Sequence, residues 1–331
     1  MKSWRALAAL ALLAVIATAG LGAWWLNKPL TLAADSVEVS IELGTPPREI
    51  AQAWVQAGVQ TSATLLYEWF RWSGQSRKIR AGSYEIGPDT TPIALLNKMV
   101  RGDETLAVVR LIEGWTFQQF RAELAKADSL KPTTATLTDE QIMQALGAPG
   151  VAPEGRFHPD TYAYSKGSSD LAVLKRAYRA MQKRLDAAWQ ERAPDSPLQK
   201  PDDALVLASI VEKETGVGAD RGRVAAVFVN RLRIGMPLQT DPTVIYGLGS
   251  AFDGNLRKRD LLADTPYNTY TRAGLPPTPI AMPGKASLLA ALHPEPTKAL
   301  YFVSRGDGSS EFSDTLADHN RAVNRYQRRS K

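Results

Sequence analysis

The sequence of 331 residues contains no cysteine. This absence excludes disulfide bonds, thiolate metal sites and a cysteine nucleophile, including that of the cysteine-dependent transpeptidases that crosslink cell walls. Histidine is scarce as well: His158, His293 and His319 lie far apart and lack the HExxH spacing of zinc hydrolases. We therefore expect no metal site and no other cofactor.

A strong excess of one charge is also missing. The 40 Lys and Arg residues against 34 Asp and Glu residues leave a formal net charge of +6. Basic residues such as Arg176, Arg179 and Lys183 are spread as on a solvated helix face, and no helix-turn-helix, RNA-binding or zinc-finger pattern occurs. A nucleic-acid partner is therefore not expected. The length allows two domains, each with its own core.

One long hydrophobic run is present, at the N-terminus. Lys2 and Arg5 precede an apolar segment over residues 6–26, which is long enough to cross a bilayer as a helix. Trp24 and Trp25 fit an interfacial aromatic belt, and the basic residues place the N-terminus in the cytoplasm. The pattern predicts a single-pass membrane protein with a cytoplasmic tail at 1–5, which in a bacterium would lie in the inner (plasma) membrane.

A cleaved signal peptide is the alternative for this segment. Ala17-Thr18-Ala19 resembles a small-residue cleavage site, although the apolar run continues beyond it. Both interpretations export the rest of the chain to the periplasm. In a bacterium, the wall polymer is then its nearest large substrate.

Residues 36–104 are predicted to form a small module. Alternating and helical patterns give a strand, two helices, a strand and a helix, at 37–43, 48–57, 63–72, 83–86 and about 91–101. This βααβα order resembles a LysM-like module. A spacer that holds the following domain off the membrane explains the pattern equally well.

Residues 105–331 are expected to form a larger mixed α+β domain. Its predicted elements include a strand at 106–112, an amphipathic helix at 170–192, a strand at 299–304 and a terminal helix after Asp318. The fold class of the whole chain is therefore α+β.

The most informative stretch is a helix within 202–216. Helical spacing places Glu214 on the apolar face that carries Ile210, whereas Glu212 follows Ser209 toward a more polar side. Burial and the partial negative charge at a helix C-terminus both raise the pKa of a carboxyl group. Glu214 is therefore our candidate general acid.

The alternative for Glu214 is an ordinary ion pair with Arg221 or Arg223 near the end of the helix. Downstream loops rich in amide, hydroxyl and aromatic groups offer what sugar rings require. The candidates for substrate binding are Asn230, Gln239, Thr240, Asp241, Tyr246, Tyr267 and Asn268. Three further carboxylates are candidates for holding the substrate-binding residues in position without touching the substrate: those of Glu113, Glu154 and Glu212.

Ordered motifs of this chain resemble the endolytic murein transglycosylase (MltG or YceG-like) family. They are ASIVEKET at 208–215, FVNRLR at 228–233, LQTDPTVIYG at 238–247, YNTY at 267–270, GLPP at 274–277, and the upstream segments 112–114, 153–155 and 159–162. Departures are few: Thr278 replaces a frequent glycine, Met282 a frequent asparagine, and Ser310 stands where many members carry histidine.

The resemblance implies that 105–331 is a transglycosylase catalytic domain with Glu214 as its catalytic residue. Such enzymes cleave between N-acetylmuramic acid and N-acetylglucosamine inside peptidoglycan strands and leave 1,6-anhydro ends. The implied partners are glycan strands, the inner membrane and peptidoglycan synthases. Two other functions stay open: a hydrolytic muramidase with Asp241 or Asp253 as base, and a non-catalytic wall-binding scaffold.

Overall fold

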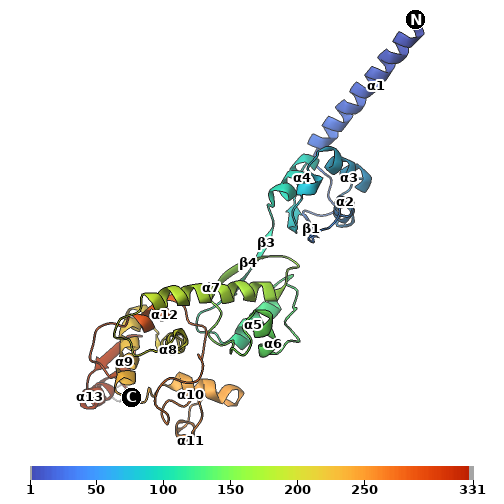
Figure 1. Cartoon of the computed structure of the whole chain (residues 1–331). Coiled ribbons are helices and arrows are strands. Elements are labelled where there is room, and N and C mark those ends of the chain that lie inside the picture. The colour runs from blue at the N-terminus through green and yellow to red at the C-terminus, as the bar shows by residue number, and fades with distance from the viewer. Residues whose placement is uncertain (1, 328–331) are drawn as a thin grey trace. The chain divides into compact units, whose positions relative to one another are not determined.

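The computed structural model describes residues 2–327 and, within them, the side chains of residue 10 and residues 12–327. The chain forms two compact units (Figure 1). The first runs up to residue 108 and adds 128–130 and 163–168; the second contains 109–127, 131–162 and the chain from 169 onward. Helices and short two-stranded sheets alternate along the sequence, so the α+β class is confirmed.

The N-terminal helix α1 extends over Lys2–Asn27 and therefore covers the predicted span at 6–26. Its large apolar side chains are exposed: Leu10, Leu12, Leu13, Val15, Ile16, Leu21 and Trp24. Among the residues that the structure describes, no helix has both the length and the hydrophobicity needed to span a membrane. The prediction of a transmembrane helix is therefore not confirmed.

The first unit has the predicted order of a strand, two helices, a strand and a helix. These elements are β1 (Val37–Ile41), α2 (Pro47–Gln56), α3 (Ala63–Trp72), β2 (Gly82–Ile86) and α4 (Pro92–Arg101), with a short 3-10 helix η1 (Ser76–Lys78) before β2. Strands β1 and β2 pair antiparallel, with Val39 opposite Tyr84. Trp54, Phe70 and Tyr84 are fully buried between the strands and helices, which gives this unit a core of its own.

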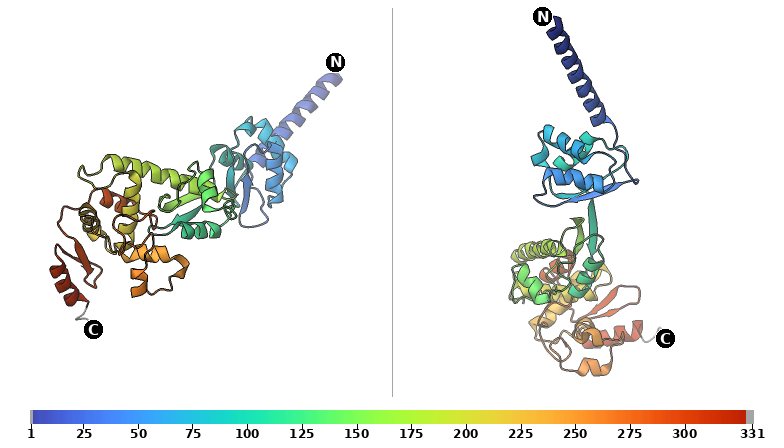
Figure 2. Two further views of the ribbon diagram at one scale, coloured as in Figure 1. Left: turned by 60° about the horizontal axis from the view of Figure 1, so that its bottom comes forward. Right: turned by 90° about the vertical axis from the view of Figure 1, so that its right-hand side faces the viewer.

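Two strands, β3 (Leu106–Leu111) and β4 (Asp160–Ser165), pair with each other. The helices of the second unit are α5 (Phe117–Lys126), α6 (Asp139–Ala145), α7 (Asp170–Gln190), α8 (Pro201–Glu214), α9 (Arg221–Arg233), α10 (Asp241–Leu248), α11 (Lys258–Leu262), α12 (Lys285–Leu292) and α13 (Leu316–Tyr326), with 3-10 helices at Gly218–Asp220 and Gly249–Ala251. Strands β5 (Tyr301–Ser304) and β6 (Ser310–Ser313) form an antiparallel hairpin that lies beside α13 at the C-terminal end of this unit (red in Figure 2).

Helix α8 is the centre of the second unit. It packs against α7, α9 and α12, and every residue from Ala204 to Val211 is buried. The predicted polar side of this helix is therefore wrong: Ser209 is fully buried, its hydroxyl donates to the carbonyl of Val206 (2.7 Å), and its oxygen accepts the N–H of Ile280 (3.0 Å). A segment distant in sequence covers this face and satisfies its hydroxyl.

Two buried serines provide a matched test of this packing. Ser209→Ala leaves the N–H of Ile280 without its acceptor, so the free energy of unfolding should fall by about 1–3 kcal/mol. Ser287→Ala is the control, because Ser287 is equally buried but its hydroxyl has no partner among the described residues. That change should be neutral or slightly stabilising. Urea unfolding followed by circular dichroism measures both, and equal costs would contradict the assignment.

Candidate active site

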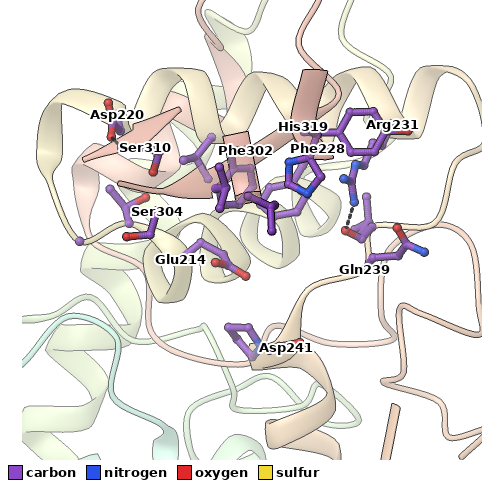
Figure 3. A pocket seen from close by; sticks show the side chains of 18 of the residues that line it. Glu214, Asp220, Phe228, Arg231, Gln239, Asp241, Phe302, Ser304, Ser310 and His319 are labelled. Atoms are coloured by element: carbon purple, nitrogen blue, oxygen red, sulfur yellow. Dashed lines mark hydrogen bonds between the residues drawn. The ribbon is translucent and has the colours of Figure 1, made fainter. Parts of the chain in front are cut away.

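Glu214 is the last residue of α8. Thr215 ends the helix in an extended conformation, while its N–H and its hydroxyl both bond to the carbonyl of Val211. The half-buried carboxyl group of Glu214 points into a cavity (Figure 3). Its Oε1 accepts a hydrogen bond from the hydroxyl of Thr240. The helix end thus presents one acidic group to the cavity.

The pKa of Glu214 is raised above its ordinary value, chiefly because burial disfavours the carboxylate. The hydrogen bond from Thr240 lowers this pKa, the nearby charge of Asp241 raises it, and the charge of Arg231 lowers it. Burial dominates, so Glu214 keeps its proton to a higher pH than a free glutamate does.

The alternative of an ion pair with a nearby arginine is not supported. Arg223 pairs instead with Glu295, at 3.6 Å between Nε and Oε2. In the part of the chain that the structure describes, neither Arg221 nor Arg223 forms an ion pair with Glu214. The acid is therefore not neutralised by a close cation.

The loop that carries Thr240 is held from several sides. Gln239 has a φ of +50°, a left-handed conformation that costs a non-glycine residue about 1 kcal/mol or more. The carbonyl of Leu238 accepts a hydrogen bond from Nη1 of Arg231 (2.6 Å). The carbonyl of Thr269 accepts the N–H of Gln239 (3.0 Å), and the hydroxyl oxygen of Thr269 accepts the N–H of Thr240 (3.1 Å). These bonds fix the hydroxyl of Thr240 against the acid.

The cavity beside Glu214 has a volume of about 830 Å³, which lies in the range of small-molecule sites. Its polar lining includes Arg231, Gln239, Asp241 and His319. One carboxylate oxygen of Asp241 accepts the hydroxyl of Tyr270 (2.5 Å). The apolar lining comes from α9 and β5, with Val224, Phe228 and Phe302. Of the predicted binding residues, Gln239 and Asp241 line this cavity, and Thr240 contacts the acid directly.

Arg231 was not among the predicted site residues, although it lines the cavity. It lies seven residues after Val224 and three after Phe228, so all three share one face of α9. The sequence did contain a signal for Arg231: it is a charged residue on the otherwise apolar, buried face of this helix. The residue predicted to bind substrate on this helix is the neighbouring Asn230.

Asn230 and Asn268 do not line this cavity. The amide of Asn230 donates to the carbonyls of Thr297 (2.8 Å) and Ala299 (3.1 Å). Asn268 is fully buried, and its amide donates to the carbonyls of residues 260, 261 and 263 while its oxygen accepts the N–H of Tyr270. Their predicted role as direct ligands is therefore corrected, since both side chains are used to hold loops.

Tyr246 and Tyr267 also lie outside the lining of this cavity. Their rings pack edge to face with centroids 5.0 Å apart, and the hydroxyl of Tyr267 bonds to that of Thr278 (2.8 Å). The hydroxyl of Tyr246 donates to Oε2 of Glu154 (3.2 Å). These tyrosines connect α10 to the loops around it.

Glu154 is a second buried carboxyl group, with only 7% of the residue exposed. Its Oε1 accepts the N–H of Phe117 (3.0 Å), and burial raises its pKa to about 7. Glu154 thus holds Tyr246 of α10, and its supporting role at the site stays a prediction.

Glu113 and Glu212 form another group of carboxylates. Oε2 of Glu212 accepts the N–H of Gly284 (2.9 Å). The pKa of Glu113 is raised by burial and then by repulsion from Glu212, against attraction from Arg221. Neither side chain lines the cavity of Glu214; both contact the segment before α12, and a Cβ at Gly284 would lie 2.0 Å from Oε1 of Glu113.

Asp253, the predicted alternative base, is paired with Arg257 at 2.7 Å, and this partner lowers its pKa to about 2. It does not line the cavity. Among the predicted alternative bases, only Asp241 lines the cavity with Glu214.

Known proteins resemble this chain over most of its length. The sequence pattern of the YceG-like family matches residues 39–325. A Bacillus subtilis (strain 168) protein named endolytic murein transglycosylase is 32% identical over 310 residues, which cover 88% of this chain and 85% of that protein. A protein of the same name from Streptococcus pneumoniae (strain R6) is 25% identical over 320 residues, 87% of this chain and 58% of that protein.

Among solved structures, a YceG-like protein from Listeria monocytogenes is similar, with a TM-score of 0.54 and 29% identity. The similarity covers 87% of this chain and 98% of that one. The likeness therefore includes the second unit, in which the cavity lies.

Two substitutions should move the pKa of Glu214 in opposite directions. Thr240→Val removes the hydrogen bond that favours the carboxylate, so the pKa should rise. Asp241→Asn removes a nearby negative charge, so the pKa should fall. Carbon-13 NMR titration of the glutamate carboxyl groups measures both. A shift in the same direction for the two variants would show that other contacts control the acid.

Glu154 should make stability depend on pH. The unfolded chain releases this proton near pH 4.5, whereas the folded protein holds it up to about pH 7. The unfolded state therefore binds fewer protons between these values, and stability should fall as the pH rises from 4.5 to 7. The loss is on the order of 3 kcal/mol.

Glu154→Gln cannot titrate and should remove this slope. Urea unfolding of both proteins at intervals from pH 4.5 to 8 provides the comparison. An unchanged slope in the variant would mean that the carboxyl of Glu154 already ionises like a free acid.

Proposed function

Because the chain belongs to the YceG-like family, we propose that the protein is an endolytic lytic transglycosylase of peptidoglycan. It cleaves the bond between N-acetylmuramic acid and N-acetylglucosamine within glycan strands and leaves 1,6-anhydro-N-acetylmuramic acid ends. In this way it terminates or trims new strands. The observation that carries the proposal is Glu214, a half-buried acid with a raised pKa that faces a large cavity and forms no ion pair with Arg221 or Arg223.

A single carboxyl group performs both chemical steps. Glu214 first donates its proton to the bridging oxygen, and the bond from that oxygen to C1 of the muramic residue breaks. The resulting carboxylate then accepts the proton of the muramic 6-hydroxyl, whose oxygen attacks C1 and closes the anhydro ring. Because the substrate supplies the nucleophile, no second carboxylate is needed to activate water.

The surroundings of Glu214 support both states of the acid. Burial favours the protonated form that the first step requires. The hydrogen bond from Thr240 and the charge of Arg231 favour the carboxylate that the second step requires. Asp241 presents a carboxylate to the same cavity, where it stabilises the positive charge that develops at C1.

A hydrolytic muramidase is the second candidate, because Asp241 lines the cavity together with Glu214 and could activate water. The products differ: hydrolysis leaves reducing ends, which are one water heavier than anhydro ends. Mass spectrometry of fragments released from purified sacculi distinguishes the two reactions. A scaffold without activity would bind the sacculi and release no fragments.

Glu214→Gln should stay folded and lose cleavage by about 10²- to 10⁴-fold, the usual contribution of a general acid and base. Glu212→Gln is the matched control, since Glu212 lies two residues earlier and bonds to the N–H of Gly284. It should keep most of the activity. Release of anhydro fragments is the assay, with circular dichroism to verify folding. The opposite pattern would make Glu212 the acid.

We further propose that α1 attaches the protein to the bacterial inner membrane, with the N-terminus in the cytoplasm and both units in the periplasm. The supporting observations are the uncharged segment 6–26 and the exposed apolar side chains of α1. Peptidoglycan synthases are then the expected protein partners. Carbonate extraction of membranes, followed by the mass of the mature chain, separates an attached helix from a cleaved signal peptide.

For the first unit we propose a LysM-like function in binding glycan. The support is its βααβα order and an exposed aromatic ring at the end of α3, because Trp72 is 77% exposed. Trp72→Ala, introduced into the full chain together with Glu214→Gln, should weaken co-sedimentation with sacculi. Unchanged co-sedimentation would favour a spacer.

A further inference from the structure

Arg231 is a buried cation in the cavity of Glu214. Only 7% of the residue is exposed, its Nε donates to the carbonyl of Leu300 (2.7 Å), and its Nη1 donates to the carbonyl of Leu238 (2.6 Å). A guanidinium has more N–H donors than these two bonds use. Among residues 2–327, no carboxylate lies within ion-pair distance of Arg231.

Among the described residues, the charge of Arg231 is met by an aromatic ring and by no ion pair. The ring of Tyr301 lies 5.3 Å from the guanidinium, and His319 stacks on this ring with centroids 5.3 Å apart. Nδ1 of His319 is buried without a partner among the described residues. Glu214 in its protonated form offers no negative charge. A largely buried cation without an ion pair in the described part of the chain therefore lines this cavity together with the apolar side chains of Phe228 and Phe302 and the carboxylate of Asp241.

Burying a charge without a counter-charge is costly, and a guanidinium matches a carboxylate in geometry as well as in charge. We propose that Arg231 binds a carboxylate of the wall polymer while Glu214 acts on the neighbouring glycosidic bond. This inference rests on the proposed function, because it takes peptidoglycan as the ligand. It assigns to the cavity a carboxylate subsite beside the acid.

Two parts of peptidoglycan carry this chemistry. A muramic residue without a peptide has a free lactyl carboxylate, and a peptide-bearing residue has carboxylates on its stem peptide. The lactyl group is attached to the sugar ring that contains C1. A bond from Arg231 to either group therefore limits the positions of the ring relative to Glu214.

The test measures binding in a Glu214→Gln background, so that the ligand is not consumed. The ligands are strands stripped of peptides, strands with intact peptides, and both kinds with their carboxylates converted to amides. The Glu214→Gln protein, the parent of the variants below, should bind at least one carboxylate ligand about tenfold or more tightly than the amide form of that ligand. Preference for the stripped strands identifies the lactyl group, and preference for the peptide-bearing strands identifies the stem.

Arg231→Met should bind each carboxylate ligand and its amide equally. Arg233→Met is the matched control, because Arg233 lies on the same helix but pairs with Asp195 and does not line the cavity. It should keep the preference for carboxylates. If the parent binds carboxylates and amides equally, or if Arg231→Met keeps the preference, the proposal is overturned.

The comparison of ligands on the parent needs no substitution at 231, so the proposal can still be refuted if Arg231→Met does not fold. Failure of the proposed function is recognised separately. In that case the unsubstituted protein releases no anhydro fragments from sacculi, whatever its preference among these ligands.

Discussion

The geometry around Glu214 depends on one partly buried hydrogen bond. The hydroxyl of Thr240 donates it to the carboxyl group of Glu214. Burial raises the pKa of Glu214 and so favours its protonated form. The hydroxyl of Thr240 opposes this effect, because it stabilises the carboxylate that remains after proton transfer. The two steps proposed for Glu214, first as an acid and then as a base, require this balance between burial and hydrogen bonding.

The balance requires the loop at 238–241 to be rigid. Thr240 follows a residue in left-handed conformation, and such strain persists only where the surroundings determine the backbone. Here Thr269 fixes the loop from one side and Arg231 from the other. Glu154 adds a third attachment through Tyr246, which lies on the helix that follows the loop. Several elements distant in sequence thus set the position of one hydroxyl.

The sequence predicted those features that depend on local spacing. The order of elements in the first unit and the position of Glu214 at the end of α8 follow from periodicity and turn residues. Features that depend on partners far along the chain were not predictable in this way. Ser209 was assigned to a polar face. Its burial could not be foreseen, because its partner Ile280 follows 71 residues later. Asn268 was expected to bind substrate, but its amide donates to backbone carbonyls instead. The positions of these carbonyls depend on the fold and cannot be read from the sequence.

Arg231 and Glu214 act on the same short segment of chain. Arg231 donates to the carbonyl of Leu238, and Thr240, two residues later, donates to Glu214. A carboxylate that binds Arg231 must share this guanidinium with the carbonyl of Leu238, and any adjustment of that bond reaches Thr240 through the backbone. A carboxylate bound at Arg231 as proposed would therefore be linked to the acid through the backbone of this segment. The loop at 238–241 thus connects the proposed carboxylate subsite with the proposed acid.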